Sequence, residues 1–294
     1  DDEGVFAGAE DHGVNMVHWW LAPWDTMLTV KPANPMEDWR DRSSFDMYHQ
    51  GRAAELDRVV GFAEKHNVKL VWTIWPHDSI RDFNYHKWRL NGSWAACFKD
   101  NPIGMTNKVS EPEWYYNAFS DLDNPPKNQK FFYDDVYKEY QNRLYRYIIA
   151  RWGYSEAIGT WALVSEMFGT FANSANCINY QGSQWVTNKG AMFGENPYLN
   201  MDMTQCDGND HGPAWLEYIN SYFKPNDPFR HPTTASYATD EYWDEGMPIV
   251  DIPQIHVYAD LYNWITPPVT LGKYHHKLHE DYNKPSFMGE IGTV

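Results

Sequence analysis

The sequence of 294 residues lacks any apolar run long enough to cross a membrane, because a transmembrane helix needs about 18 or more consecutive apolar residues. Positive charge is also scarce: 24 Lys and Arg stand against 40 Asp and Glu, which gives a formal net charge of −16. Phosphate backbones and anionic lipid headgroups repel such a chain. We therefore expect neither a membrane nor a nucleic acid as a partner.

Cysteine is rare too, with only Cys97, Cys177 and Cys206 in the chain. Their spacing matches neither a zinc site nor a disulfide framework, so it gives no indication of a metal. Cys177 and Cys206 flank one loop-like segment and could form a disulfide if the protein is secreted. The alternative is that both are free, buried thiols.

The chain contains instead a regular alternation of short apolar strands and amphipathic helices. Apolar residues recur at helical spacing in the expected helices and run together in the expected strands. This alternation predicts an α/β fold with a parallel sheet. The expected strands are 14–21, 68–75, 161–164, 233–237, 252–258 and 286–290, and the expected helices are 53–66, 131–152, 213–223 and 269–282.

Two segments, 79–127 and 170–212, are too long to be simple connections in a compact domain, so we expect both to be functional. Each follows the carboxyl end of an expected strand. We predict a (β/α)8 TIM barrel that shows six strands, with the first and last strands outside the sequence. The chain starts in what looks like the end of a helix and shows no domain boundary. We therefore expect one partial catalytic domain over 1–294 and further domains in the full-length chain.

Two glutamates stand at the ends of two of these strands. Glu166 follows the apolar residues 161–164, and Glu290 lies between Gly289 and Gly292. In a (β/α)8 barrel, residues just past the strands line the catalytic mouth. Paired carboxyl groups are what glycoside hydrolysis requires. The alternative is that each Glu merely pairs with Lys or Arg on a neighbouring loop.

Aromatic residues make up 17% of the chain and include 15 Trp. Trp24, Trp75 and Trp264 lie beside Pro, Asp, Asn or His in loop-like segments. A flat aromatic face packs well against a sugar ring, so tryptophans at a barrel mouth would suit a carbohydrate site. The alternative is that they belong to a Trp-rich core.

Further candidates for the mouth come from the strands themselves. His256 and Tyr258 are two residues apart on one expected strand, so they point to the same face. A Tyr hydroxyl near a nucleophilic Glu could orient it. His18 and Trp20 lie on the first expected strand, and His77 follows the second. A half-buried His–Tyr pair in the core is the alternative for His256 and Tyr258.

The order of these motifs resembles the glycoside hydrolases of clan A, the retaining (β/α)8 enzymes that include the family 5 cellulases and mannanases. The resemblance spans nearly the whole chain and is specific for the clan but not for a substrate. It implies that the visible strands are the second to the seventh of the barrel. The segments that carry it are Trp161-Ala-Leu-Val-Ser-Glu166, Asp227-Pro-Phe-Arg-His-Pro-Thr-Thr-Ala-Ser236, His256-Val-Tyr258 and Gly289-Glu290-Ile-Gly292.

The resemblance implies that Glu166 is the acid/base and Glu290 the nucleophile, with Tyr258 orienting Glu290. The chain departs from the clan at two positions. Ser165 stands where the clan usually has an Asn that contacts the sugar 2-hydroxyl, and His18 is the nearest match to an Arg that supports the nucleophile. The clan also has a Trp on its eighth strand, which commonly forms the floor of the subsite for the cleaved sugar. The matching position would lie beyond Val294.

The sequence therefore predicts a retaining β-glycoside hydrolase acting on a neutral polysaccharide or oligosaccharide, secreted or at the cell surface, with no cofactor and no metal. The first alternative is a non-catalytic carbohydrate-binding barrel that keeps the aromatic cleft. The second is a metal-dependent barrel hydrolase that uses His18, His77 and His256.

Overall fold

A computed structural model describes residues 2–22, 26–29, 46–80, 130–167, 170, 210–237, 243–259 and 267–293. Most of the two long segments, all three cysteines, Trp24 and Trp264 lie outside these residues. The expectations about them, including the Cys177–Cys206 disulfide, stay predictions. No helix in the described ranges is long and apolar enough to span a membrane.

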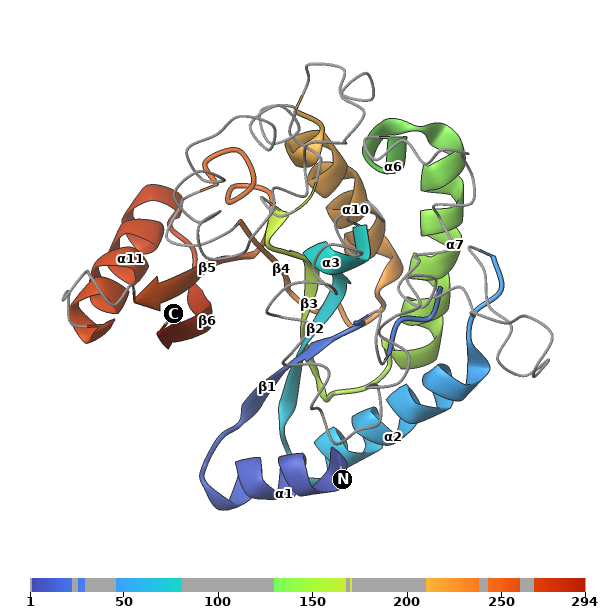
Figure 1. The fold of residues 1–294 in the computed structure, drawn as a ribbon, viewed down its shortest axis with the longest axis horizontal. Coiled ribbons are helices and arrows are strands. Elements are labelled where there is room, and N and C mark those ends of the chain that lie inside the picture. The colour runs from blue at the N-terminus through green and yellow to red at the C-terminus, as the bar shows by residue number, and fades with distance from the viewer. Residues whose placement is uncertain are drawn as a thin grey trace, which may run out of the picture.

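Six parallel strands form one sheet in the order in which they occur in the chain (Figure 1). Within the described residues, the first strand pairs only with the second and the sixth only with the fifth. The predicted parallel α/β fold is confirmed, whereas a closed eight-stranded barrel stays a prediction. The strands are β1 (Met16–Trp20), β2 (Lys69–Pro76), β3 (Ile158–Ser165), β4 (Thr233–Ser236), β5 (Ile252–Ala259) and β6 (Phe287–Thr293).

Helices connect the strands and flank the sheet (Figure 1). The helix α2 packs against β2, α10 packs against β3 and α7, and α11 lies beside β5 and β6. Each connection returns the chain to the same end of the sheet, as parallel pairing requires. The helices are α1 (Asp2–Asp11), α2 (Gln50–Lys65), α3 (His77–Ile80), α6 (Lys130–Tyr133), α7 (Asp135–Trp152), α10 (Gly212–Asn226) and α11 (Pro267–Tyr282).

The boundaries of these helices follow from capping residues. α2 is followed by Asn67, which takes a left-handed φ of 52°, a conformation that Asn tolerates better than most residues. The expected helix 131–152 is two helices in the structure. Asp134 separates them because its carboxylate accepts a hydrogen bond from the Val136 N–H at 2.9 Å, which makes it the N-cap of α7.

The core between the sheet and the helices is rich in tryptophan. The ring of Trp72 on β2 lies 5.2 Å from that of Trp152 on α7 and 5.9 Å from that of Trp161 on β3. Trp161 also donates its indole N–H to the buried Asp227 at 2.9 Å. This packing holds β2 and β3 against the helices, and it fixes the positions of the carboxyl ends of both strands.

Candidate active site

Glu166 lies immediately after β3, where the chain turns away from the sheet. Its φ of 58° is in the left-handed region, which is uncommon for a residue other than glycine. The Glu166 N–H donates to the hydroxyl of Ser236, the last residue of β4, at 2.9 Å. The side chain of Ser236 is fully buried, so the neighbouring strand fixes the turn that presents the Glu166 carboxylate.

Glu290 lies on β6, opposite His256 of β5 in the parallel register. The register shifts between Ile255 and His256, and this irregularity places His256 directly opposite Glu290. The residue before Glu290 leaves room for a neighbouring side chain. A Cβ on Gly289 would lie 2.4–2.7 Å from three side-chain atoms of the buried Gln254, so a larger residue would displace either the Gln254 amide or β6.

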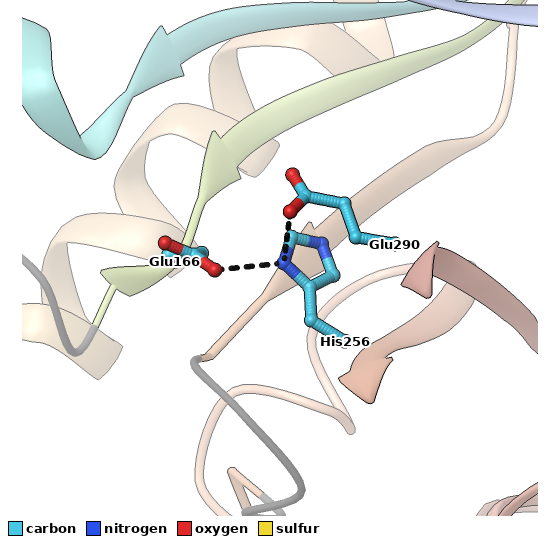
Figure 2. Close-up of side chains that lie close together, drawn as sticks. All are labelled: Glu166, His256 and Glu290. Carbon is cyan, nitrogen blue, oxygen red and sulfur yellow. Dashed lines mark hydrogen bonds and ion pairs between the residues drawn. The ribbon is translucent and has the colours of Figure 1, made fainter. Parts of the chain in front are cut away.

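His256 lies between the two glutamates (Figure 2). Its Nδ1 is 3.1 Å from Oε1 of Glu166 and 3.5 Å from Oε2 of Glu290. The imidazole is buried, while the side chains of Glu166 and Glu290 are 18% and 20% exposed. The two acids are therefore open to a ligand on one side and contact the same nitrogen on the other.

His77, at the start of α3, contacts the second oxygen of Glu166. Its Nδ1 lies 3.0 Å from Glu166 Oε2, and its side chain is almost completely buried. The half-buried Trp20 packs edge-on against His77 with ring centroids 6.3 Å apart. Each carboxylate oxygen of Glu166 thus meets a histidine, one from β5 and one from α3.

His18 of β1 reaches the strand that carries Glu290. Its Nε2 accepts the indole N–H of Trp20 at 3.1 Å and lies 2.5 Å from the Thr73 hydroxyl on β2. Nε2 is therefore an acceptor, and the other ring nitrogen carries the proton that bonds the Gly289 backbone. Burial above all, and then the neighbouring His256, lowers the pKa of His18 to about 4, against a smaller raising effect from Gly289. His18 is thus neutral near pH 7.

Ser165 is the last residue of β3 and is 1% exposed. Its hydroxyl has no hydrogen-bond partner among the residues that the structure describes. A buried hydroxyl without a partner is costly, and it would be satisfied by a polar group of a ligand at the neighbouring Glu166.

The structure brings most of the sequence-predicted site residues together at the carboxyl ends of β1, β2, β3, β5 and β6. The residues gathered there are Glu166, Glu290, His18, Trp20, His77, Ser165 and His256. Tyr258 belongs to β5, but its side chain lies outside the described part of the structure.

Trp75 is the exception. The prediction that its side chain lies at the mouth of the barrel is wrong. Its side chain is 1% exposed, and its indole N–H donates to the hydroxyl of Tyr145 on α7 at 2.9 Å. Tyr145 in turn donates to the buried Gln141, so the indole is part of a polar network within the core. The position next to Pro76 and His77 suggested a loop, but the indole packs behind the sheet.

Three residues that contact the site were not singled out from the sequence. Ser236 holds the turn of Glu166, Thr73 contacts His18, and Gln254 packs against Gly289. All are polar residues on apolar strands, which is the only signal that could have indicated them. Each acts on a residue that is distant in sequence.

Glu166, His256 and Glu290 are also the residues that could hold a metal ion, because one ligand atom of each lies within 4.8 Å of the others. The same atoms fit a simpler arrangement. An N–H on Nδ1 of His256 lies between the two carboxyl groups and can donate to an oxygen of either one, at 3.1 and 3.5 Å. The geometry alone therefore requires no metal at this site.

No family model and no curated sequence matches the chain. A glycoside hydrolase family 5 mannosidase from Rhizomucor miehei superposes with a TM-score of 0.52 at 14% identity, over 98% of this chain and 62% of that one. In fold, this chain is similar to family 5 glycoside hydrolases. A β-1,4-D-mannanase from Cryptopygus antarcticus gives a TM-score of 0.50 at 14% identity, over 97% and 67% of the two chains.

The chain thus spans less than two thirds of the Rhizomucor enzyme. Identities this low show a shared fold and no more. The side chains of the site place a pair of carboxylates at the end of the sheet where parallel α/β folds bind their ligands.

Proposed function

We propose that the protein is a retaining glycoside hydrolase that cleaves β-glycosidic bonds of a neutral polysaccharide or oligosaccharide by double displacement, within a complete (β/α)8 barrel. One observation carries the proposal. Oxygens of Glu166 and Glu290 approach within 4.8 Å of each other around His256. Retaining pairs stand roughly 5–5.5 Å apart, whereas inverting pairs stand about 6.5–9.5 Å apart to admit a water.

The roles of the two acids follow from this mechanism. In the first step, Glu290 attacks the anomeric carbon while Glu166 gives its proton to the leaving oxygen, and the glycosidic bond breaks. In the second step, Glu166, now a carboxylate, takes a proton from water. The water oxygen bonds to the anomeric carbon, and the ester bond to Glu290 breaks.

The substrate class is inferred from charge and from the neighbours. A net charge of −16 disfavours a polyanionic polysaccharide. The solved structures of similar fold are described as a mannosidase and a mannanase, so β-mannosides are the first substrates to test. We also propose a secreted or cell-surface enzyme, since polymers of this kind occur outside cells.

Hydrolysis of a panel of aryl β-glycosides, with the anomer of the first-formed sugar read by NMR, tests the proposal. Release of the β-anomer supports it, and release of the α-anomer contradicts the retaining mechanism. Binding of oligosaccharides without any turnover would favour the alternative, a non-catalytic carbohydrate-binding barrel. This alternative is tested because Ser165, which is buried, and His18, which is neutral, are the two departures from the clan. Turnover that a chelator abolishes and Zn²⁺ restores would favour a metal-dependent hydrolase.

A further inference from the structure

His256 presents one nitrogen to two acids. Nδ1 lies 3.1 Å from Glu166 and 3.5 Å from Glu290, and Nε2 is buried with no hydrogen-bond partner among the described residues. A proton on Nε2 would find no acceptor among these residues, whereas a proton on Nδ1 faces an oxygen of each acid. A ring proton therefore belongs on Nδ1, where a single N–H is shared by the two acceptors.

The proposed reaction moves one negative charge between these acceptors. Before the first step, Glu290 is charged and Glu166 carries a proton. In the glycosyl-enzyme, Glu290 is a neutral ester and Glu166 is charged, and the second step returns the charge to Glu290. A donor located between the two oxygens can bond the charged one in each state without moving its ring, which burial holds in place.

We propose that His256 is a shared hydrogen-bond donor that follows this charge, bonding Glu290 in the resting enzyme and Glu166 in the intermediate. The proposal rests on the proposed function for the direction in which the charge moves. It assigns His256 a role toward the two acids themselves, in addition to the contact with substrate expected from the sequence. It also predicts that the ionisation of both acids depends on one residue.

The other titratable groups around His256 do not take this role. His18 faces it from β1 and bonds the Gly289 backbone, so its own proton is directed elsewhere. The low pKa of His18, about 4, means that His18 places no positive charge beside His256 near pH 7. His77 contacts the opposite oxygen of Glu166 from α3. His256, by contrast, contacts both glutamates through its Nδ1.

The pH dependence of kcat/KM separates a shared donor from a donor that serves one acid. Protonation of Glu290 sets the acid limb of the profile and deprotonation of Glu166 sets the basic limb. Loss of the shared N–H in His256→Phe destabilises both charged forms. We therefore expect both limbs to move to higher pH by about one unit each. In His256→Asn, whose amide can place an N–H near the position of Nδ1, both limbs should stay close to their wild-type positions, whatever the rate.

Movement of one limb only, or of neither, in His256→Phe would overturn the proposal. Equal movement of both limbs in His256→Asn would do the same, since it would show that the N–H is not the cause.

A second measurement needs neither turnover nor a change at His256. In protein labelled with [15N]histidine, the slowly exchanging Nδ1–H signal of His256 should persist in Glu166→Ala and in Glu290→Ala, because one acceptor remains in each. It should disappear in the double variant. Its loss in either single variant would refute sharing. Because this result is independent of hydrolysis, it distinguishes failure of the inference from failure of the proposed function.

Discussion

Oε1 of Glu166 lies 3.1 Å from Nδ1 of His256, although β4 separates the strands to which the two residues belong. The contact is possible because Glu166 leaves β3 with a φ of 58°, held by the hydroxyl of Ser236 on the intervening strand. A left-handed turn just past a strand thus brings a carboxylate to the centre of the site.

Glu166→Ala should remove acid assistance and base catalysis but leave the nucleophile in place. For substrates with a poor leaving group, we expect kcat/KM to fall by about 10²- to 10⁴-fold. A dinitrophenyl glycoside, which needs no proton on its leaving group, should lose much less in kcat/KM. Added azide should restore turnover and yield a β-glycosyl azide, detected by NMR. An α-glycosyl azide, or no effect of azide, would contradict the assigned role.

Gly289→Ala should impair the site more than the fold. The added methyl would meet the buried amide of Gln254 at 2.4–2.7 Å, so either this amide or β6 must shift, and a shift of β6 would move the adjacent Glu290. Displacement by an ångström can cost about 100-fold in kcat. Gly61→Ala is the matched control, because a Cβ on this residue of α2 meets nothing within 4 Å. Equal activities of the two variants would show that the tight contact at Gly289 does not matter.

His18 should make stability depend on pH below neutrality. Its pKa is about 4 in the folded protein, against an ordinary value of 6.5, so the unfolded chain binds more protons between these limits. The free energy of unfolding should therefore fall as pH falls from 6.5 to 4, with a contribution from His18 on the order of 1–3 kcal/mol.

Urea unfolding across this pH range measures the effect. His18→Asn should flatten the dependence on pH. His276→Asn, which removes a histidine from the exposed surface of α11, should leave the slope as in the wild type. An unchanged slope in His18→Asn would argue against a buried neutral imidazole on β1.

Trp75 and Trp20 should respond differently to substitution. Trp75→Phe removes the hydrogen bond to Tyr145 and part of a buried ring, so we expect a loss of about 1–3 kcal/mol in the free energy of unfolding. Trp20→Phe removes a donor to His18 at the half-buried site and should mainly reduce kcat/KM. Thermal unfolding and kinetics on both variants check this. A Trp75→Phe variant with normal stability and poor substrate binding would contradict the core position of Trp75 and favour a position at the mouth.

The sequence was sufficient to predict the order of the elements, because periods of 2 and 3.6 residues are local properties. All six strands and the four expected helices lie within a few residues of their predicted positions, apart from the break that Asp134 introduces. The ends of parallel strands meet at one edge, so Glu166, Glu290, His18 and His77 could be expected to lie near one another.

Contacts that depend on distant partners could not be predicted in this way. The indole of Trp75 faces α7 because the hydroxyl of Tyr145, 70 residues away, accepts its N–H. His256 reaches both acids because the register of β5 and β6 shifts at Ile255. Neither a hydroxyl acceptor 70 residues away nor a register shift leaves a periodic trace in the sequence.

The central claim is that Glu290 forms a covalent bond to the sugar, and trapping that intermediate tests it most directly. Incubation with a dinitrophenyl 2-deoxy-2-fluoro-β-mannoside, or with the corresponding derivative of whichever sugar is hydrolysed, should slow the second step and accumulate the glycosyl-enzyme. Mass spectrometry should then find one fluorosugar per chain, on the peptide that contains Glu290. Hydrolysis of the parent glycoside by a Glu290→Ala variant at the wild-type rate, or a label on another residue, would contradict the account.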